Sequence, residues 1–92
     1  MSSIYNFFFF WLRCEKVKAG MACVRAVFRY SPKAHNVVAV SAAGYKSCST
    51  PRGARVLTTG NDRVTLRRGT NYFICSIPGH CQAGMKIAVT AA

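Results

Sequence analysis

The sequence predicts an all-β domain, a sandwich or barrel built from short strands. Two observations lead to this fold class: apolar and polar side chains alternate with a period of two in several short segments, and turn-forming residues separate those segments. The chain has 92 residues, which is enough for one domain with a small hydrophobic core. A hydrophobic content of 51% argues against a disordered chain.

The strand pattern is clearest in residues 24–30, where Val24, Ala26 and Phe28 lie on one face of the strand and Arg25 and Arg29 on the other. Four later segments fit strands by alternation or by their branched and aromatic content, namely 35–40, 63–67, 70–77 and 86–90. Turn signals separate them at Ser31-Pro32, Pro51-Arg52-Gly53, Gly60-Asn61-Asp62, Arg68-Gly69 and Pro78-Gly79. Residues 42–56 have no clean period and predict a loop with at most a short helix.

A set of soft metal-binding side chains is concentrated near the C-terminus. Cys75, His80 and Met85 follow one another at equal spacing, and His35 lies upstream; this set uses both histidines of the chain. Two histidines and a cysteine in a plane, with a weakly bound axial methionine, are the ligands of mononuclear copper sites that transfer electrons. Because thiolate and thioether ligands select copper over hard cations, the sequence predicts a copper site.

The predicted strands place these four side chains close together. Cys75 shares a strand face with Phe73, which is expected to point inward. A Pro-Gly turn then lets His80 fold back over Cys75, and Met85 opens the last strand on its apolar face. His35 is expected to begin a different strand, so that the metal would join two parts of the sandwich.

The same residues are open to other interpretations. Cys75 or Met85 taken alone is more often an ordinary core residue. Zinc is the main rival metal, because Cys48, Cys75, His80 and Cys81 could form a Cys/His site. We favour copper because adjacent His80 and Cys81 would need a contorted backbone to share one ion, and no Cys-x-x-Cys pair exists in the sequence.

The remaining cysteines can form a disulfide bond. If Cys75 is a thiolate ligand, a structural disulfide must come from Cys14, Cys23, Cys48 and Cys81. Cys48 with Cys81 is the natural pair, since it would anchor the loop directly after His80, although spacing alone leaves open that both are reduced. A disulfide beside a copper thiolate implies an oxidising compartment outside the cytoplasm.

The chain is strongly basic, with a formal net charge of +11. We expect attraction to acidic partners that weakens as salt is added. The cations are spread along the sequence, and no recognition helix or stacking-aromatic motif accompanies them, so a specific nucleic-acid surface is not expected. An acidic redox partner protein or an anionic cell-wall matrix fits the charge equally well, and we expect a monomer. No histidine remains as a base and no carboxylate pair exists, so we do not expect an enzyme.

The chain begins with a segment that is rich in apolar side chains. The apolar run within it, 4–12, is too short to span a bilayer. It also makes a poor signal peptide, because no positive charge precedes it and charged residues crowd the place of a cleavage site. No transmembrane span is expected. A lipid anchor at the C-terminal end is not expected either, because no hydrophobic tail is present there.

Several stretches of the sequence resemble the phytocyanin family of cupredoxins, and within it the basic plantacyanins. They are Val27-Phe28-Arg29-Tyr30-Ser31-Pro32, His35-Asn36-Val37-Val38-Ala39-Val40, Ala43-Gly44-Tyr45-Lys46-Ser47-Cys48, Pro51-Arg52-Gly53-Ala54-Arg55, Gly60-Asn61-Asp62-Arg63-Val64-Thr65-Leu66, and all residues from Gly69 onward. The match is closest over 27–92, and it implies an atypical N-terminal segment, 1–17, followed by a phytocyanin domain, 18–92. It implies a cupredoxin-like Greek-key β-sandwich, one type 1 copper ion bound by His35, Cys75, His80 and Met85, and a disulfide between Cys48 and Cys81. Methionine at the axial position separates this chain from stellacyanin-like members, which carry glutamine.

The N-terminal third departs from the family pattern. A phytocyanin begins with a secretion signal and a first strand, and only Lys18-Ala19-Gly20 remains of that region, which indicates an altered or truncated start. The expected fold therefore lacks or replaces its first strand, which would leave an open sheet edge. Residues 7–10 are candidates to refill that place or to aggregate. The family implies an extracellular location.

The resulting functional prediction is single-electron transfer by a blue copper protein. The alternative is a non-redox extracellular protein whose cationic surface binds acidic cell-wall or receptor surfaces. Asn36 is a further candidate, because a hydrogen bond from it to the backbone near Cys75 would fix the ligand strand. An ordinary role for Asn36 at a strand edge is the competing interpretation.

Overall fold

The computed structural model describes residues 2–5, 8–17 and 20–91, with side-chain burial described from Val24 to Ala91. Over these ranges the chain forms two four-stranded antiparallel sheets and one short helix, which confirms the all-β prediction. The elements are β1 (Ser2–Tyr5), β2 (Phe8–Val17), β3 (Gly20–Arg29), β4 (Val37–Val40), α1 (Ala42–Ser47), β5 (Val56–Leu57), β6 (Asn61–Thr65), β7 (Gly69–Ile74) and β8 (Lys86–Ala91).

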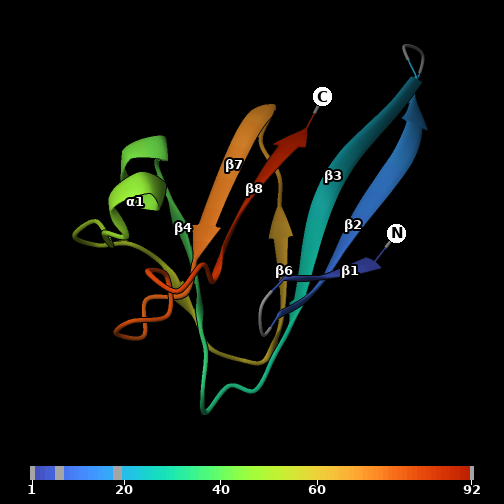
Figure 1. The fold of residues 1–92 in the computed structure, drawn as a ribbon. Coiled ribbons are helices and arrows are strands. Elements are labelled where there is room, and N and C mark those ends of the chain that lie inside the picture. Colours follow the sequence, from blue (N-terminus) through green and yellow to red (C-terminus); the bar gives the residue numbers. More distant parts are fainter. Residues whose placement is uncertain (1, 6–7, 18–19, 92) are drawn as a thin grey trace.

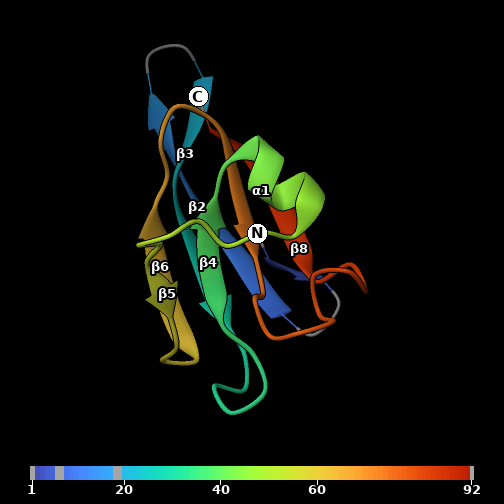
Figure 2. The same cartoon turned by 90° about the vertical axis from the view of Figure 1, so that its left-hand side faces the viewer.

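The two sheets have the strand orders β1-β2-β3-β6 and β5-β4-β7-β8. The chain passes to the second sheet after β3, returns to the first before β6, and leaves it again for β7. Figure 1 shows β7 and β8 on one side of the molecule and β2 and β3 on the other, while Figure 2 brings β4 to the front with α1 beyond its upper end. The connections that leave β3 and β7 both lie toward the lower end of Figure 1.

Alternating side chains build the core between the sheets. In β3, Ala26 and Phe28 are completely buried while Arg25 is exposed, as the period of two predicts. Phe28 meets Phe73 of β7 edge to face, with ring centroids 5.0 Å apart. In β8, Ile87 and the apolar residues that alternate with it are buried in the same core. The contact between Phe28 and Phe73 therefore joins the two sheets.

A network of side-chain hydrogen bonds lies beside this core. The hydroxyl of Tyr30 lies 2.9 Å from the carbonyl oxygen of Leu57 and also hydrogen-bonds the carboxylate of Asp62. Thr59 donates a hydrogen bond of 2.7 Å to the other oxygen of that carboxylate. Burial, with a further contribution from Asp62, raises the pKa of Tyr30, so its hydroxyl stays protonated and available as a donor. The Tyr30 hydroxyl therefore links Asp62 of β6 with Leu57 of β5, which belong to different sheets.

The strand expected from His35 begins two residues later, at Val37. The reason is a turn, in which the amides of Ala34 and His35 both donate to the carbonyl oxygen of Ser31 at 3.0 Å. Residues 42–56, which were expected to form a loop with at most a short helix, contain the short helix α1. Ser41 caps this helix by accepting a hydrogen bond of 3.1 Å from the Gly44 amide.

The N-terminal strands cover the edge that was expected to be open. β2 pairs along β3 from Phe9 opposite Arg29 to Val17 opposite Gly20, and β1 pairs with the outer side of β2. Of the candidate refilling residues 7–10, residues 8–10 belong to β2, and residue 7 lies outside the described residues. The same register sets the Cα atom of Cys14 opposite that of Cys23. The division of the chain at residue 17 remains a prediction.

Candidate metal centre

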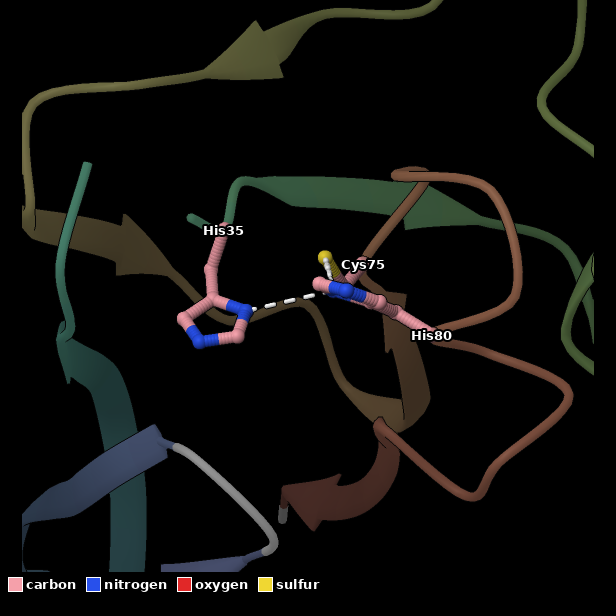
Figure 3. Close-up of side chains that lie close together, drawn as sticks. All are labelled: His35, Cys75 and His80. Carbon is pink, nitrogen blue, oxygen red and sulfur yellow. Dashed lines mark hydrogen bonds between the residues drawn. The ribbon is translucent and has the colours of Figure 1, made fainter. Parts of the chain in front are cut away.

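The predicted ligands lie on connections at one end of the second sheet. His35 lies between the Ser31 turn and β4, and Cys75 follows the last residue of β7. The connection from β7 to β8 then folds back, because the His80 amide donates to the carbonyl oxygen of Ile77 at 3.0 Å. Two segments far apart in the sequence therefore supply the three side chains that Figure 3 shows facing one another.

The three donor atoms converge on one point. The Nδ1 atoms of His35 and His80 are 3.2 Å apart, and the Cys75 Sγ atom lies 3.4 Å from the His80 Nδ1 atom. All three ligand atoms lie within 4.8 Å of one another. Donors about 2.0–2.3 Å from a shared metal ion, at trigonal or tetrahedral angles, are spaced by about 3.3–3.7 Å. His35, Cys75 and His80 are therefore positioned to bind a metal ion.

The chemical state of these side chains also suits a soft metal. Cys75 is completely buried and is free among the cysteines whose side chains the structure describes. Burial and the neighbouring His80 lower the pKa of His35, which favours the neutral imidazole that can donate a lone pair. One thiolate with two imidazoles is a donor set that copper prefers over hard cations. The residues present thus fit a copper ion.

Met85 is held beside these ligands through its backbone. Its amide donates to the carbonyl oxygen of His80 at 3.0 Å, and its own carbonyl accepts from the Cys75 amide at 3.1 Å. Its side chain is 1% exposed and belongs to the same buried cluster as Cys75. The inward orientation expected of Met85 is therefore present, while the bond from its thioether to a metal stays a prediction.

Asn36 links the two segments that carry the ligands. Its Oδ1 atom accepts a hydrogen bond of 2.8 Å from the Ser76 amide, and its Nδ2 atom donates one of 2.9 Å to the Ser76 hydroxyl. This is the contact to the backbone next to Cys75 that the sequence analysis considered. Asn36 is 8% exposed, so water competes little for these bonds. Because Asn36 follows His35 directly, the pair of bonds fixes the relative positions of His35 and Cys75.

A disulfide bond restrains the loop that carries His80 and excludes the proposed zinc site. Cys48 and Cys81 are joined by an S–S bond of 2.04 Å. Cys81 directly follows His80, so this bond ties the histidine-bearing loop to the end of α1. A zinc site made of Cys48, Cys75, His80 and Cys81 is excluded in this structure, because two of its four ligands are consumed by the disulfide.

Sequence reasoning missed Ser76 as the partner of Asn36. A hydrogen-bonding residue directly after a predicted ligand is a weak signal, and nothing in the sequence pairs it with a residue forty positions away. It also missed that arginines from separate segments gather around one cleft, because no run of cations marks them.

Among the described residues, no helix is both long and apolar enough to cross a lipid bilayer.

Comparisons with known proteins agree with this geometry. A family model described as a plastocyanin-like domain matches residues 3–85, a range that starts within the segment set apart by sequence. Chemocyanin from Lilium longiflorum is 68% identical over 66 residues, which cover 72% of this chain and 52% of that protein. The chain thus spans about half the length of this relative. Basic blue protein from Cucumis sativus is 48% identical over 81 residues, which cover 88% of this chain and 81% of that protein.

Two solved structures are similar in fold and sequence. Cucumber basic protein, a blue copper protein, has a TM-score of 0.70 and 55% identity, with 72% of this chain and 69% of that chain covered. Spinach plantacyanin has a TM-score of 0.70 and 62% identity, with 72% of each chain covered. The chain therefore belongs to the plastocyanin-like family, within the phytocyanins that include the basic blue proteins and plantacyanins.

Proposed function

We propose that the protein carries single electrons with one type 1 copper ion bound by His35, Cys75, His80 and Met85. The observation that supports this most is the convergence of two imidazole nitrogens and one buried thiol within 4.8 Å. Bound copper supplies the one-electron chemistry, by changing between two oxidation states. The protein's part is to hold the donor atoms in one arrangement and to keep water away from the thiolate.

The contacts around the ligands support a rigid site. The Cys75 amide donates to Met85, the neighbouring Ser76 is held by Asn36, and the disulfide at Cys81 restrains His80. Each restraint fixes backbone next to a ligand, so little rearrangement accompanies a change of charge. A small rearrangement keeps the barrier to electron transfer low.

His80 is the candidate for the point at which electrons enter and leave. It is half-buried, and the preceding Pro78 and Gly79 are exposed, so a partner can approach its ring. Cys75 is inaccessible by comparison. We propose that a partner docks over this loop rather than at the cysteine.

The finer functional assignments are also proposals. The net charge of +11 supports an acidic redox partner protein or an anionic matrix. The disulfide supports an oxidising, extracellular location. We also propose that the protein is a monomeric electron carrier and catalyses no reaction of its own. Both histidines and Cys75 are assigned to the metal, so none of them is left as a catalytic base.

Voltammetry of the copper-loaded protein tests the function. A reversible one-electron wave that disappears in the Cys75→Ser variant is the expected result, because the serine hydroxyl is a poor copper ligand. A matched Ser47→Ala variant, changed at an exposed hydroxyl of α1, retains the wave. A folded, copper-loaded wild-type protein without a reversible wave contradicts the proposal.

A further inference from the structure

A cleft of about 750 Å³, lined by polar and apolar groups in similar amounts, lies between the two sheets and includes none of the predicted ligands. Its walls come from the ends of β4 and β7 that are remote from the ligands, together with β5, β6 and the turn after β6. Along β7 the lining runs from Thr70 to Phe73, and Phe73 precedes Cys75 by two residues, or about 7 Å along an extended strand. The cleft is therefore a separate place on the molecule, and its volume lies in the range of roughly 300–1,000 Å³ that ligand sites occupy.

Four arginines line this cleft: Arg55, Arg63, Arg67 and Arg68. All four are exposed. Among the described side chains the only carboxylate is that of Asp62, which is buried and hydrogen-bonded to Tyr30 and Thr59. The arginines thus share one cleft without a described carboxylate to neutralise them. Bringing like charges together costs free energy that a bound anion would recover.

The local structure presents two of these arginines in a fixed position. The side chain of Asn71 accepts a hydrogen bond of 2.9 Å from the Arg67 amide and donates one of 2.8 Å to the Arg67 carbonyl oxygen. It also donates to the Gly69 carbonyl oxygen at 3.2 Å, and Gly69 has a positive φ of 96°, which completes the tight turn. Because Asn71 of the following strand β7 fixes this turn, binding requires little ordering of the backbone that carries Arg67 and Arg68.

The remaining lining indicates what kind of anion fits. Arginine pairs with carboxylates through two parallel hydrogen bonds. Thr65, Thr70 and the half-buried Tyr72 also line the cleft, and the Tyr72 ring packs on one side against the ring of Tyr45, with centroids 5.2 Å apart. Hydroxyl groups hydrogen-bond sugar hydroxyls, and an aromatic ring offers a flat apolar surface to a sugar face. A sugar acid offers carboxylates for the arginines and hydroxyls for the threonines on every residue of the polymer.

We propose that this cleft binds a stretch of acidic polysaccharide whose sugars carry carboxylates. The site goes beyond electron transfer and works without copper, so the two functions can fail separately. It would attach a mobile electron carrier to an anionic polymer while the metal end stays accessible.

Calorimetric titration of the full chain with galacturonate oligomers tests the proposal, at physiological ionic strength and both with and without copper. Saturable binding is expected, and oligomers with methyl-esterified carboxyls bind at least about tenfold more weakly because the charge is gone. Polyglutamate, which has carboxylates without sugars, also binds more weakly. Equal affinity for polyglutamate or for duplex DNA overturns the proposal in favour of unspecific attraction to polyanions.

Two charge-matched variants locate the site. The cleft variant combines Arg63→Gln, Arg67→Gln and Arg68→Gln, and the control combines Arg25→Gln, Lys46→Gln and Arg52→Gln, which are exposed cations outside the cleft. The cleft variant is expected to lose about tenfold or more in affinity and the control less than about threefold.

Equal losses in the two variants contradict the proposal. Amide chemical shifts of the wild-type protein provide a second measurement that needs no variant. Galacturonate oligomers should shift residues 63–73 and leave 75–85 unchanged; the reverse pattern assigns the anion to the metal end and overturns the proposal.

Discussion

Removing the side chain of Asn36 should destabilise the copper-free protein far more than removing its partner hydroxyl. Asn36→Ala deletes both hydrogen bonds to Ser76, the one from the backbone amide at 2.8 Å and the one to the hydroxyl at 2.9 Å. Ser76→Ala deletes only the second. The two variants therefore separate the bond that fixes the backbone beside Cys75 from the bond between side chains.

The expected magnitudes follow from the partners left behind. Asn36→Ala leaves the Ser76 amide without its acceptor, and a buried donor without a partner costs about 1–3 kcal/mol. With the second bond also lost, the free energy of unfolding should fall by about 2–3 kcal/mol. Ser76→Ala should cost about 1 kcal/mol or less, since Ser76 is half-buried and its loss leaves one amide proton of Asn36 unpaired. In a domain of this size, 1 kcal/mol corresponds to roughly 4–8 °C in Tm.

Urea denaturation of the copper-free protein with its disulfide intact measures both losses, and equal m-values show that the comparison is valid. In the copper-loaded protein, Asn36→Ala should also change the visible absorption more than Ser76→Ala does. If the two variants unfold at the same urea concentration, the amide of Ser76 does not depend on Asn36, and the assigned role in positioning Cys75 is wrong.

Two further predictions concern the disulfide and His35. Replacing Cys48 and Cys81 by serine should lower the free energy of unfolding by about 4 kcal/mol, as measured by urea titration. The magnitude follows from their separation of 33 residues, which sets the entropy of the unfolded chain that the bond removes. A loss below about 1 kcal/mol contradicts this. The lowered pKa of His35 means that the unfolded chain takes up a proton first as the pH falls below about 6.5. The copper-free protein should therefore be less stable at pH 5.5 than at pH 7.5, as measured by its urea midpoint, and His35→Gln should flatten this dependence; an unchanged dependence refutes the assignment.

The parts of the fold that sequence could predict are those governed by local patterns. Alternation from Val24 to Tyr30 identified the strand that carries the buried Phe28. The turn signals at Ser31-Pro32 and Pro78-Gly79 fall in connections, whereas the expected turn at Gly60-Asn61-Asp62 was wrong in part, because β6 begins at Asn61. The ligand set was predictable because a thiol, two imidazoles and a thioether form a rare combination whose chemistry points to one kind of metal. These inferences needed no knowledge of which strands are neighbours.

The contacts that depend on neighbouring strands could not be predicted. Asn36 reaches Ser76 because β4 and β7 pair with Val38 opposite Ile74, and this register is not written in either segment alone. The start of β4 was misplaced by two residues because the carbonyl oxygen of Ser31 accepts two amide protons and keeps His35 in a turn.

The cationic cleft shows the same limitation at the surface. Arg55, Arg63, Arg67 and Arg68 look evenly spread in the sequence, which suggested a solvated shell. The folding of β5, β6 and β7 against one another gathers them around a single cleft. Only the three-dimensional arrangement distinguishes a binding site from scattered surface charge.

Titration of the purified, copper-free protein with cupric ion tests the central claim most directly. We expect an intense visible band from thiolate-to-copper charge transfer that saturates at a single equivalent, and its loss in the Cys75→Ser variant. A folded wild-type protein that stays colourless through the titration would contradict the account, because the buried thiol and the two imidazoles would then not share a copper ion.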